Sequence, residues 1–397
     1  MRNRDYIVNR SWAEVNLDAI RHNLQALRKQ LWKPTRIMAV VKADAYGHGV
    51  THVAQHMLES GADYLAVSLL DEAIELRQLG IHAPILILSY TDPRRASEIV
   101  KYELTQTVYS TELLEALEQA GTYLGRLVRV HIKVDTGMSR LGLHPDQRGL
   151  DFVQAIARLA HIEVEGIFTH FASADEADPT FTRLQFSRFL DFCEQLQKRG
   201  VQIPLRHCCN SAATLRFPEM HLDMVRPGLL LYGHLPDCCE DFREAYLPAM
   251  SLKSTVIMSK RIARGSSVSY GRIFTAEEER QILTIPIGYA DGYSRRMSER
   301  AEVLIRGQRC PIVGRICMDS CMVDATELAG PAPEIGEEVL LFGRQRDPEG
   351  REQELQVEEL ATWADSVSYE MLCMIGKRVP RVYVSNQELL DVTSAIL

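Results

Sequence analysis

The sequence predicts an α/β fold, with an N-terminal (β/α)8 barrel of the TIM type followed by a C-terminal, mostly β domain. Over the first two-thirds of the chain, short β-branched runs alternate with longer amphipathic stretches, as in a parallel sheet of βα units. After about Tyr246 the pattern changes to short strands separated by turn residues. Polar side chains also fall at the ends of five predicted strands, where such barrels form their active sites.

Eight short runs rich in β-branched residues are the predicted strands of the barrel. The intervening stretches carry apolar residues at helical spacing, as in residues 71–79 and 180–198, and therefore predict the surrounding helices. A further helix over residues 17–30 precedes the first strand. The predicted strands are residues 37–41, 64–67, 85–88, 106–109, 128–134, 164–169, 205–208 and 222–225.

The C-terminal part predicts a separate β domain. Arg306-Gly307 has the composition of a hairpin turn, and residues 344–354, rich in charge and containing Pro348 and Gly350, predict an exposed hairpin loop. We therefore divide the chain into an extension (1–11), a barrel (12–246) and a β domain (247–397). The predicted strands of the β domain are residues 252–262, 282–285, 302–305, 308–313 and 338–342.

Composition excludes several classes of protein. A formal charge of −8 argues against a nucleic-acid partner, which requires a basic face. We expect no membrane segment, because no apolar run is long enough to span a bilayer. The start lacks the apolar core of a signal peptide, which predicts a cytoplasmic protein. The nine cysteines include no CxxC and the histidines no HExxH, so we expect reduced thiols and no metal.

Lys42 is the most informative residue, because it ends the apolar run of residues 37–41. An ammonium group there is costly unless it is paired or used covalently. Lysine forms Schiff bases when desolvation lowers its pKa, and Tyr46, Gly47 and Gly49 would let a phosphate approach the backbone. This combination suggests pyridoxal 5'-phosphate (PLP). The alternative is a strand-end lysine whose ammonium group reaches solvent.

Four other strand ends carry similar chemistry. In a (β/α)8 barrel the carboxyl ends of the strands meet at one mouth, so side chains distant in sequence are expected to converge there. They are Lys133 and Asp135 after the fifth strand, His170 after the sixth, Asn210-Ser211 after the seventh, and Arg226 at the end of the eighth.

The chain resembles the alanine racemases, PLP enzymes built of a barrel and a β domain, over almost its whole length. Nine motifs occur in the order found in that family, so the resemblance does not rest on one pattern. They are VKADAYGHG (41–49), KVDTGMSRLG (133–142), FTHF (168–171), NSAA (210–213), VRPG (225–228), VSYG (268–271), GYADG (288–292), GRICMD (314–319) and SYE (368–370).

The resemblance implies a two-base interconversion of L-alanine and D-alanine. Lys42 would hold PLP and act as one base, and Tyr270 would be the other, with His170 and Arg226 supplying a positive environment. Arg226 would contact the pyridine nitrogen, which a guanidinium group does not protonate. Two alternatives concern single residues: Tyr270 as a buried aromatic with one hydrogen bond, and Arg226 paired with Asp223.

The resemblance also implies the remaining site residues. PLP would be bound by Lys42, Tyr46, His170, Asn210, Ser211, Arg226, Gly228, Leu229 and Tyr369. Arg140 and the Met318 amide would bind the substrate, with Lys133, Tyr289, Arg315, Cys317 and Asp319 in support. The family pattern is a homodimer in which Tyr270 and Met318 complete the partner's site. Lys133 is either carbamylated, as in many relatives, or a solvated lysine.

The sequence leaves alternatives in substrate and role. A serine or broad-specificity racemase is the nearest alternative, although Tyr369 favours alanine, because broad-range relatives carry a smaller residue there. A non-catalytic PLP-binding protein would lack the β domain, and a PLP decarboxylase would need other motifs. Departures from the family are Asp44, Ser139 and the pair Cys208-Cys209, which we interpret as packing residues. Supply of D-alanine for peptidoglycan is the expected role.

Overall fold

The computed structural model describes residues 10–32, 34–156 and 158–394. These residues form two compact units. Residues 10–18, 46–49 and 248–394 make up a β-rich unit, and residues 19–45 and 50–247 make up a barrel unit. Within the described residues, no helix is long and apolar enough to cross a membrane.

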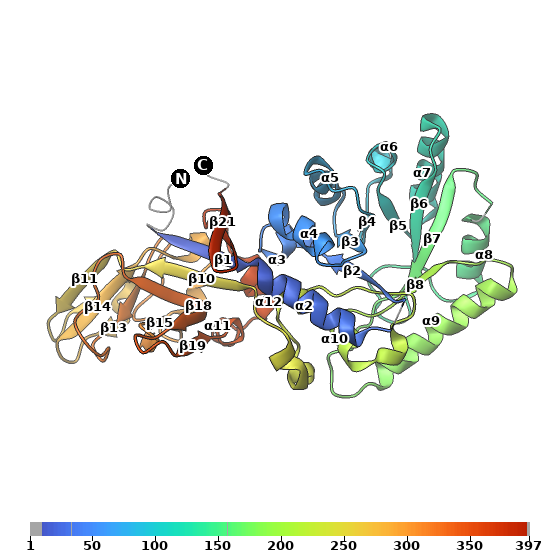
Figure 1. Cartoon of the computed structure of the whole chain (residues 1–397). Helices are drawn as coiled ribbons and strands as arrows, with labels where there is room; N and C mark the ends of the chain where they lie inside the picture. Colours follow the sequence, from blue (N-terminus) through green and yellow to red (C-terminus); the bar gives the residue numbers. More distant parts are fainter. Residues whose placement is uncertain (1–9, 33, 157, 395–397) are drawn as a thin grey trace. The chain divides into compact units, whose positions relative to one another are not determined.

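The barrel unit is a parallel sheet in the order β8-β7-β6-β5-β4-β3-β2-β9, which confirms the predicted (β/α)8 fold (Figure 1). The Arg206 carbonyl accepts from the Asp223 amide at 3.1 Å, and the Cys209 carbonyl accepts from the Arg226 amide at 2.9 Å. These bonds place β9 beside β8 and close the ring. The strands are β2 (Arg36–Val40), β3 (Tyr64–Val67), β4 (Ile85–Ile87), β5 (Thr105–Val108), β6 (Val128–Lys133), β7 (Ile162–Phe168), β8 (Leu205–His207) and β9 (Met224–Val225).

Helices connect the strands and cover the outside of the barrel (Figure 1). In α9, Phe189, Phe192 and Leu196 are buried, at the three- and four-residue spacing of a helix face that packs on a sheet. The predicted helices 17–30 and 180–198 are confirmed, and the helix predicted over 71–79 begins one residue earlier. The helices are α2 (Leu17–Gln30), α4 (Val50–Glu59), α5 (Leu70–Gln78), α6 (Ala96–Lys101), α7 (Thr111–Leu124), α8 (Gln147–Ile156), α9 (Thr180–Lys198) and α10 (Ser211–Arg216).

The β-rich unit contains two main sheets. One has the order β16-β15-β18-β10-β1-β20-β21, with β19 paired to β18, and the other has the order β11-β14-β17. Helices α11 (Val357–Trp363) and α12 (Ser368–Cys373) belong to this unit. The strands are β1 (Ser11–Asn16), β10 (Met250–Thr255), β11 (Met258–Ile262), β12 (Ser267–Val268), β13 (Phe274–Thr275), β14 (Arg280–Ile285), β15 (Glu302–Ile305), β16 (Gln308–Pro311), β17 (Cys321–Asp324), β18 (Glu338–Arg346), β19 (Glu352–Leu355), β20 (Arg381–Ser385) and β21 (Glu388–Thr393).

Three predictions about this unit need correction. The single strand predicted over 252–262 is two strands, β10 and β11, which pair in different sheets. The predicted loop 344–354 is largely the β18–β19 ladder, in which Arg344 pairs with Glu354. The barrel does not begin at Trp12, because β1 pairs with β10 and β20 and so belongs to the β-rich unit. Most of the predicted extension 1–11 lies outside the described residues.

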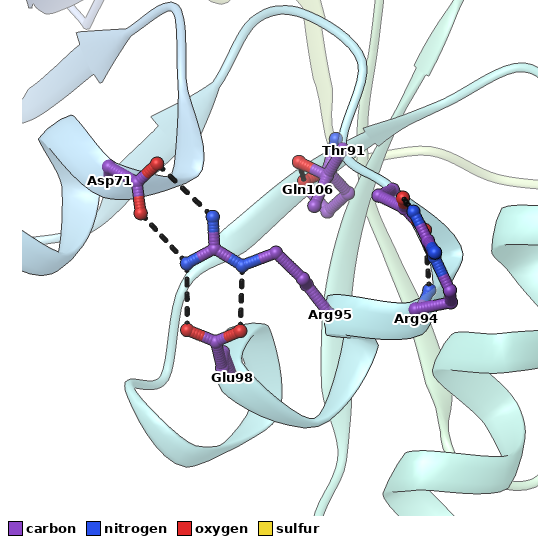
Figure 2. A network of polar contacts seen from close by, with 7 residues as sticks. Asp71, Thr91, Arg94, Arg95, Glu98 and Gln106 are labelled. Atoms are coloured by element: carbon purple, nitrogen blue, oxygen red, sulfur yellow. Dashed lines mark hydrogen bonds and ion pairs between the residues drawn. The ribbon is translucent and has the colours of Figure 1, made fainter.

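The outer helices of the barrel carry exposed polar contacts, of which Figure 2 shows one group. Arg95, at the start of α6, donates to Asp71 of α5 at 2.8 and 3.1 Å and to Glu98 at 2.7 and 2.8 Å. Thr91 donates to Gln106 at 2.8 Å in a buried contact nearby. The Arg95 contacts therefore join two neighbouring helices at the surface, where water competes for each ion pair.

Candidate active site

Lys42 follows β2 and opens a single left-handed turn. Ala43, Asp44, Ala45 and Tyr46 have φ of 53°, 53°, 54° and 52°, a conformation that costs an L-residue on the order of 1 kcal/mol each. Two hydrogen bonds hold the turn: the Ala43 amide donates to Glu72 at 2.6 Å, and the Val50 amide to Asp44 at 2.7 Å. Such strain typically occurs at functional sites, and Lys42 itself is partly buried.

Lys133 is the last residue of β6 and is only 5% exposed. Its Nζ donates to the Val134 carbonyl at 2.9 Å, so the interpretation as a solvated lysine is wrong. Burial, together with the charges of Arg226 and Arg140, lowers the pKa of Lys133 to about 7. A large fraction of this amine is therefore uncharged at neutral pH, and an uncharged amine is nucleophilic.

Arg226 follows β9 and is buried. Its Nη1 donates to His207 Nδ1 at 2.9 Å, and its Nη2 to the Thr169 carbonyl at 2.8 Å. Burial lowers the pKa of Arg226 to about 10, so the guanidinium group remains charged at neutral pH. The alternative pairing with Asp223 is wrong, because Asp223 accepts from Arg206 at 2.9 Å instead.

His170 lies against Arg226, whose Nη2 is 3.2 Å from His170 Nδ1. Because arginine is donor-only, Nδ1 accepts, and the neutral ring carries its proton on Nε2. Burial and the charges of Arg226, Arg140, Lys133 and Lys42 hold the pKa of His170 well below its usual value. The expectation that His170 adds positive charge is therefore corrected: Arg226 supplies the charge, and His170 is a neutral hydrogen-bonding group.

Ser211 opens α10 and organises the loop after β9. Its Oγ accepts from the Gly228 amide at 3.0 Å and from the Leu230 amide at 3.3 Å, which leaves its own hydrogen to donate elsewhere. Asn210 caps the helix by accepting from the Ala213 amide at 2.9 Å. The residues predicted after β8 and β9 are thus brought together. Asn210 caps the start of α10, and Leu229 lies in sequence between Gly228 and Leu230, whose amides donate to Ser211.

The loop after β6 returns tightly on itself. Asp135 accepts from the Gly137 and Ser139 amides at 2.9 and 3.0 Å. Although burial raises the pKa of Asp135, these amides bring it below its usual value. A side chain at Gly142 would come within 2.7 Å of the Asp135 nitrogen, so this position requires glycine. The loop presents Arg140 as an exposed side chain.

The β-rich unit collects the other predicted residues on one surface. Tyr270 is 70% exposed and Met318 is 51% exposed, so the interpretation of Tyr270 as a buried aromatic is wrong. The Tyr289 amide donates to the Cys317 carbonyl at 3.1 Å, and the Ser269 hydroxyl donates to the Arg315 carbonyl at 2.6 Å. These contacts link the loops that carry the predicted residues. Asp319 is held by Arg378 at 2.7 Å.

Tyr46 and Tyr369, both predicted to bind phosphate, also fall in the β-rich unit. Burial raises the pKa of Tyr46 above its usual value, and Cys373 and Tyr369 act in the same direction. The Tyr46 hydroxyl is therefore protonated at neutral pH and can donate a hydrogen bond.

Sequence reasoning missed three residues connected to Arg226, of which His131 and His207 are buried and Glu165 is partly buried. His207 ends β8 and bonds Arg226, while His131 and Glu165 lie behind His207 on β6 and β7. Polar residues within apolar strands were the available signal. The pair Cys208-Cys209, in contrast, is buried as predicted, and burial raises the pKa of Cys209 well above its usual value.

Both parts of the chain match known families. Residues 15–236 match the family model "Alanine racemase, N-terminal domain", and residues 249–383 match "Alanine racemase, C-terminal domain". The chain is 45% identical over 374 residues to an alanine racemase of Desulforamulus reducens, which covers 94% of this chain and 98% of the relative. It is 46% identical over 377 residues to the alanine racemase of Desulfovibrio desulfuricans, and this match covers 94% of this chain and 98% of the relative.

Solved structures give the same result. The alanine racemase of Clostridium difficile 630 superposes with a TM-score of 0.92 at 40% identity, covering 98% of this chain and 99% of the other. That of Bartonella henselae, solved with covalently bound pyridoxal phosphate, superposes with a TM-score of 0.83 at 28% identity, covering 94% and 99%. These similarities extend over both units of the chain.

Proposed function

This chain belongs to the alanine racemase family, and we propose that it interconverts L-alanine and D-alanine with two bases, Lys42 of one subunit and Tyr270 of its partner. The observation that carries the proposal is the division of the site residues into a buried cluster at the barrel mouth and an exposed surface containing Tyr270. Lys42 belongs to the barrel group and Tyr270 to the exposed surface, so the proposed pair of bases draws on both groups.

The family is PLP-dependent, and PLP supplies an electron sink that acidifies the Cα–H of a bound amino acid. The residues of the barrel suit this cofactor. Lys42 provides the amine that would hold it. The Ser211 hydroxyl, whose oxygen already accepts two amides, has its hydrogen available for a phosphate oxygen, and Tyr46 and Tyr369 would add two further hydroxyl donors.

Arg226 would face the pyridine nitrogen. A guanidinium group donates hydrogen bonds but does not give up its proton at neutral pH, and burial leaves the pKa of Arg226 at about 10. The ring nitrogen would therefore be hydrogen-bonded without being protonated, which weakens the electron sink and favours return of the proton to Cα over transfer of the amino group.

Lys42 and Tyr270 would exchange protons with opposite faces of Cα. Proton transfer by a positioned side chain contributes ~10²- to 10⁴-fold to a rate. Arg140 and the Met318 amide would hold the substrate carboxylate, since an arginine offers several donors in one plane. Tyr369 would limit the space beside the substrate methyl group, which favours alanine over larger substrates.

Substrate preference is tested by racemisation assays with L-alanine, L-serine and several larger amino acids. We expect the highest kcat/KM with alanine. A higher value with serine would contradict the proposed substrate while leaving the reaction type intact, and racemisation of none of them would contradict the reaction.

The shared site is tested by complementation. Lys42→Ala and Tyr270→Ala proteins, each inactive, are mixed, dissociated and reassociated. Random pairing in a two-fold dimer makes about half of the dimers mixed, each with one complete site, so about a quarter of the wild-type activity should return. Heterodimers detected by native mass spectrometry without recovered activity would contradict bases drawn from two chains. Each variant reassociated with itself is the control.

A further inference from the structure

A chain of polar side chains runs through the interior of the barrel from Arg226 to Glu165. Arg226 Nη1 lies 2.9 Å from His207 Nδ1, and His207 Nε2 lies 2.8 Å from His131 Nδ1. His131 Nε2 then lies 3.0 Å from Glu165 Oε2. Both imidazoles are completely buried, so each ring nitrogen in the chain depends on the next group for its hydrogen bond.

The hydrogen bonds from Arg226 to Glu165 all run in one donor-to-acceptor direction. Arginine can only donate, so His207 Nδ1 must accept, and the neutral His207 ring carries its proton on Nε2. That proton is donated to His131 Nδ1, and His131 in turn donates from Nε2 to the Glu165 carboxylate. The opposite tautomer of His207 would set an N–H group against the Arg226 donor. The contacts therefore assign the tautomers of both rings.

The directions in which the pKa values of these groups are shifted favour the same assignment. Burial lowers the pKa of His131 and, together with Arg226, holds the pKa of His207 well below its usual value. Burial raises the pKa of Glu165, but the hydrogen bonds from His131 and Tyr64 bring it below its usual value. At neutral pH the chain thus consists of a cation, two neutral rings and an anion.

The backbone of β6 and β7 leaves room for the hydrogen-bonded side chains. The β6–β7 pairing runs from Val130 opposite Val164 to His131 opposite Gly166, which leaves Glu165 as the extra residue of a bulge. Bulges re-aim side chains and are common beside active sites. A side chain at Gly166 would come within 2.6 Å of the His131 ring, so glycine is required for the ring to take its place.

The far end of the chain lies at the amino-terminal side of the barrel. Tyr64, the first residue of β3, donates to Glu165 Oε1 at 3.1 Å, and Arg36, the first residue of β2, lies 3.4 Å from the Tyr64 hydroxyl. The Glu165 side chain is 15% exposed. Arg226, in contrast, follows the carboxyl end of β9, so the chain spans the barrel core from one end towards the mouth.

The groups that Arg226 contacts directly are neutral. Its positive charge is therefore compensated in part through the hydrogen-bonded connection to Glu165. It donates to His207, to His170 and to the carbonyls of Thr169 and Cys208. Within residues 10–32, 34–156 and 158–394, Glu165 is the carboxylate that side-chain hydrogen bonds connect to it. An uncompensated buried cation is costly, and the aligned dipoles of two imidazoles carry part of the compensation from Glu165.

We propose that Glu165 is a positioning residue that acts through His131 and His207 to hold the Arg226 guanidinium group in place and charged. The effect on catalysis rests on the proposed function, in which Arg226 faces the pyridine nitrogen of PLP. The hydrogen-bond polarity of the chain does not rest on it, which allows the two to be tested separately.

The first test measures the tautomers by ¹⁵N NMR on holoenzyme labelled with ¹⁵N at histidine. His131→Gln and His207→Gln proteins assign the two sets of signals. At pH 7 both rings should be protonated on Nε2 and unprotonated on Nδ1. A proton on Nδ1 of either ring would overturn the proposed relay, whatever reaction the enzyme catalyses.

The second test compares Glu165→Gln with Glu163→Gln, a matched change on the same strand, where Glu163 lies 3.4 Å from Arg129. Glutamine at 165 still accepts from His131, so the change removes charge and keeps the contact. We expect kcat to fall about tenfold with KM for alanine little changed, in the range typical of hydrogen-bond partners behind a catalytic group. Glu163→Gln should match the wild type in kcat and Tm, whereas Glu165→Gln should lower Tm, because the buried Arg226 cation loses part of its compensation.

A third variant, Gly166→Ala, displaces the His131 ring and should lower kcat at least as much as Glu165→Gln. Equal kcat in the two glutamine variants, with the expected tautomers present, would overturn the positioning role. If the wild type does not racemise alanine, the proposed function fails, and the NMR measurement still decides the polarity of the chain.

Discussion

The barrel cluster and the β-rich surface, which carry the two groups of predicted site residues, differ in burial. Lys133 and Arg226 are 5% and 4% exposed, whereas Tyr270 and Met318 are 70% and 51% exposed. The barrel groups are ordered by hydrogen bonds within their own unit. The β-rich groups are placed by backbone contacts between loops, and their side chains remain open to a further surface. The barrel group is therefore preorganised by folding, while the side chains of the β-rich group remain exposed.

The largest expected effect comes from removing Lys42 from the barrel half. Lys42→Ala should lower racemisation by at least ~10³-fold, because the covalent anchor and one base are lost together. In the wild type, borohydride reduction and peptide mass mapping should place the pyridoxyl group on Lys42. Label on another lysine would contradict the assignment, and Lys101→Ala, on an exposed face of α6, is the matched control.

Removing the phenol from the exposed half should affect catalysis and leave the fold intact. Tyr270→Phe should lower racemisation by ~10²- to 10³-fold with PLP still bound, because Tyr270 is 70% exposed and contributes little to packing. Isotope exchange at Cα should survive preferentially from D-alanine, the substrate assigned to Lys42. Equal loss from both enantiomers would speak against two bases. Tyr123→Phe, at an exposed tyrosine, controls for loss of a hydroxyl.

Replacing Lys133 should have an effect of intermediate size, a change in how stability depends on pH. Its pKa is about 7 in the folded chain and 10.5 as the ordinary value, so between these values the unfolded chain binds more protons. Stability should therefore rise with pH across this window, by at most ~1.4 kcal/mol per pH unit. Urea unfolding of Lys133→Met should lack this rise, while Lys198→Met, at an exposed lysine, should keep it. An identical slope in both variants would contradict the low pKa.

The same uncharged amine is the form that reacts with CO2, forming an N–C bond and releasing one proton. With ¹³C-bicarbonate at pH 8, we expect one protein carbamate signal by ¹³C NMR, which weakens as the pH falls below 7 and the amine is protonated. The signal should be absent from Lys133→Arg. Its persistence in that variant would place the carbamate on another amine.

The smallest effect is expected at the surface contacts of Figure 2. Asp71→Asn removes one of the two carboxylate charges beside Arg95 and leaves the Glu98 carboxylate in contact with it. Exposed ion pairs contribute little, so Tm should change by less than about 2 °C and activity by less than twofold. A loss of several degrees by calorimetry would show that this pair supports the barrel more than its exposure indicates.

The sequence by itself determined the barrel and predicted the chemistry at its mouth. Strand and helix periods are local patterns, and the carboxyl ends of parallel strands meet wherever the sheet closes, so Lys42, Lys133, His170 and Arg226 could be assigned to one site. The motifs further supplied the family and the residues of the β domain. Their roles in binding PLP and substrate remain predictions.

The tertiary structure decided which groups these residues contact. Asp223 is near Arg226 in sequence, yet it pairs with Arg206, while Arg226 reaches His207 across the closed barrel. The burial of Lys133 and the place of β1 in the β-rich sheet likewise depend on segments distant in sequence. Tyr64 and Glu165 are 101 positions apart in the sequence and form a hydrogen bond. Partner choice and burial follow from how the chain closes on itself, which local spacing does not encode.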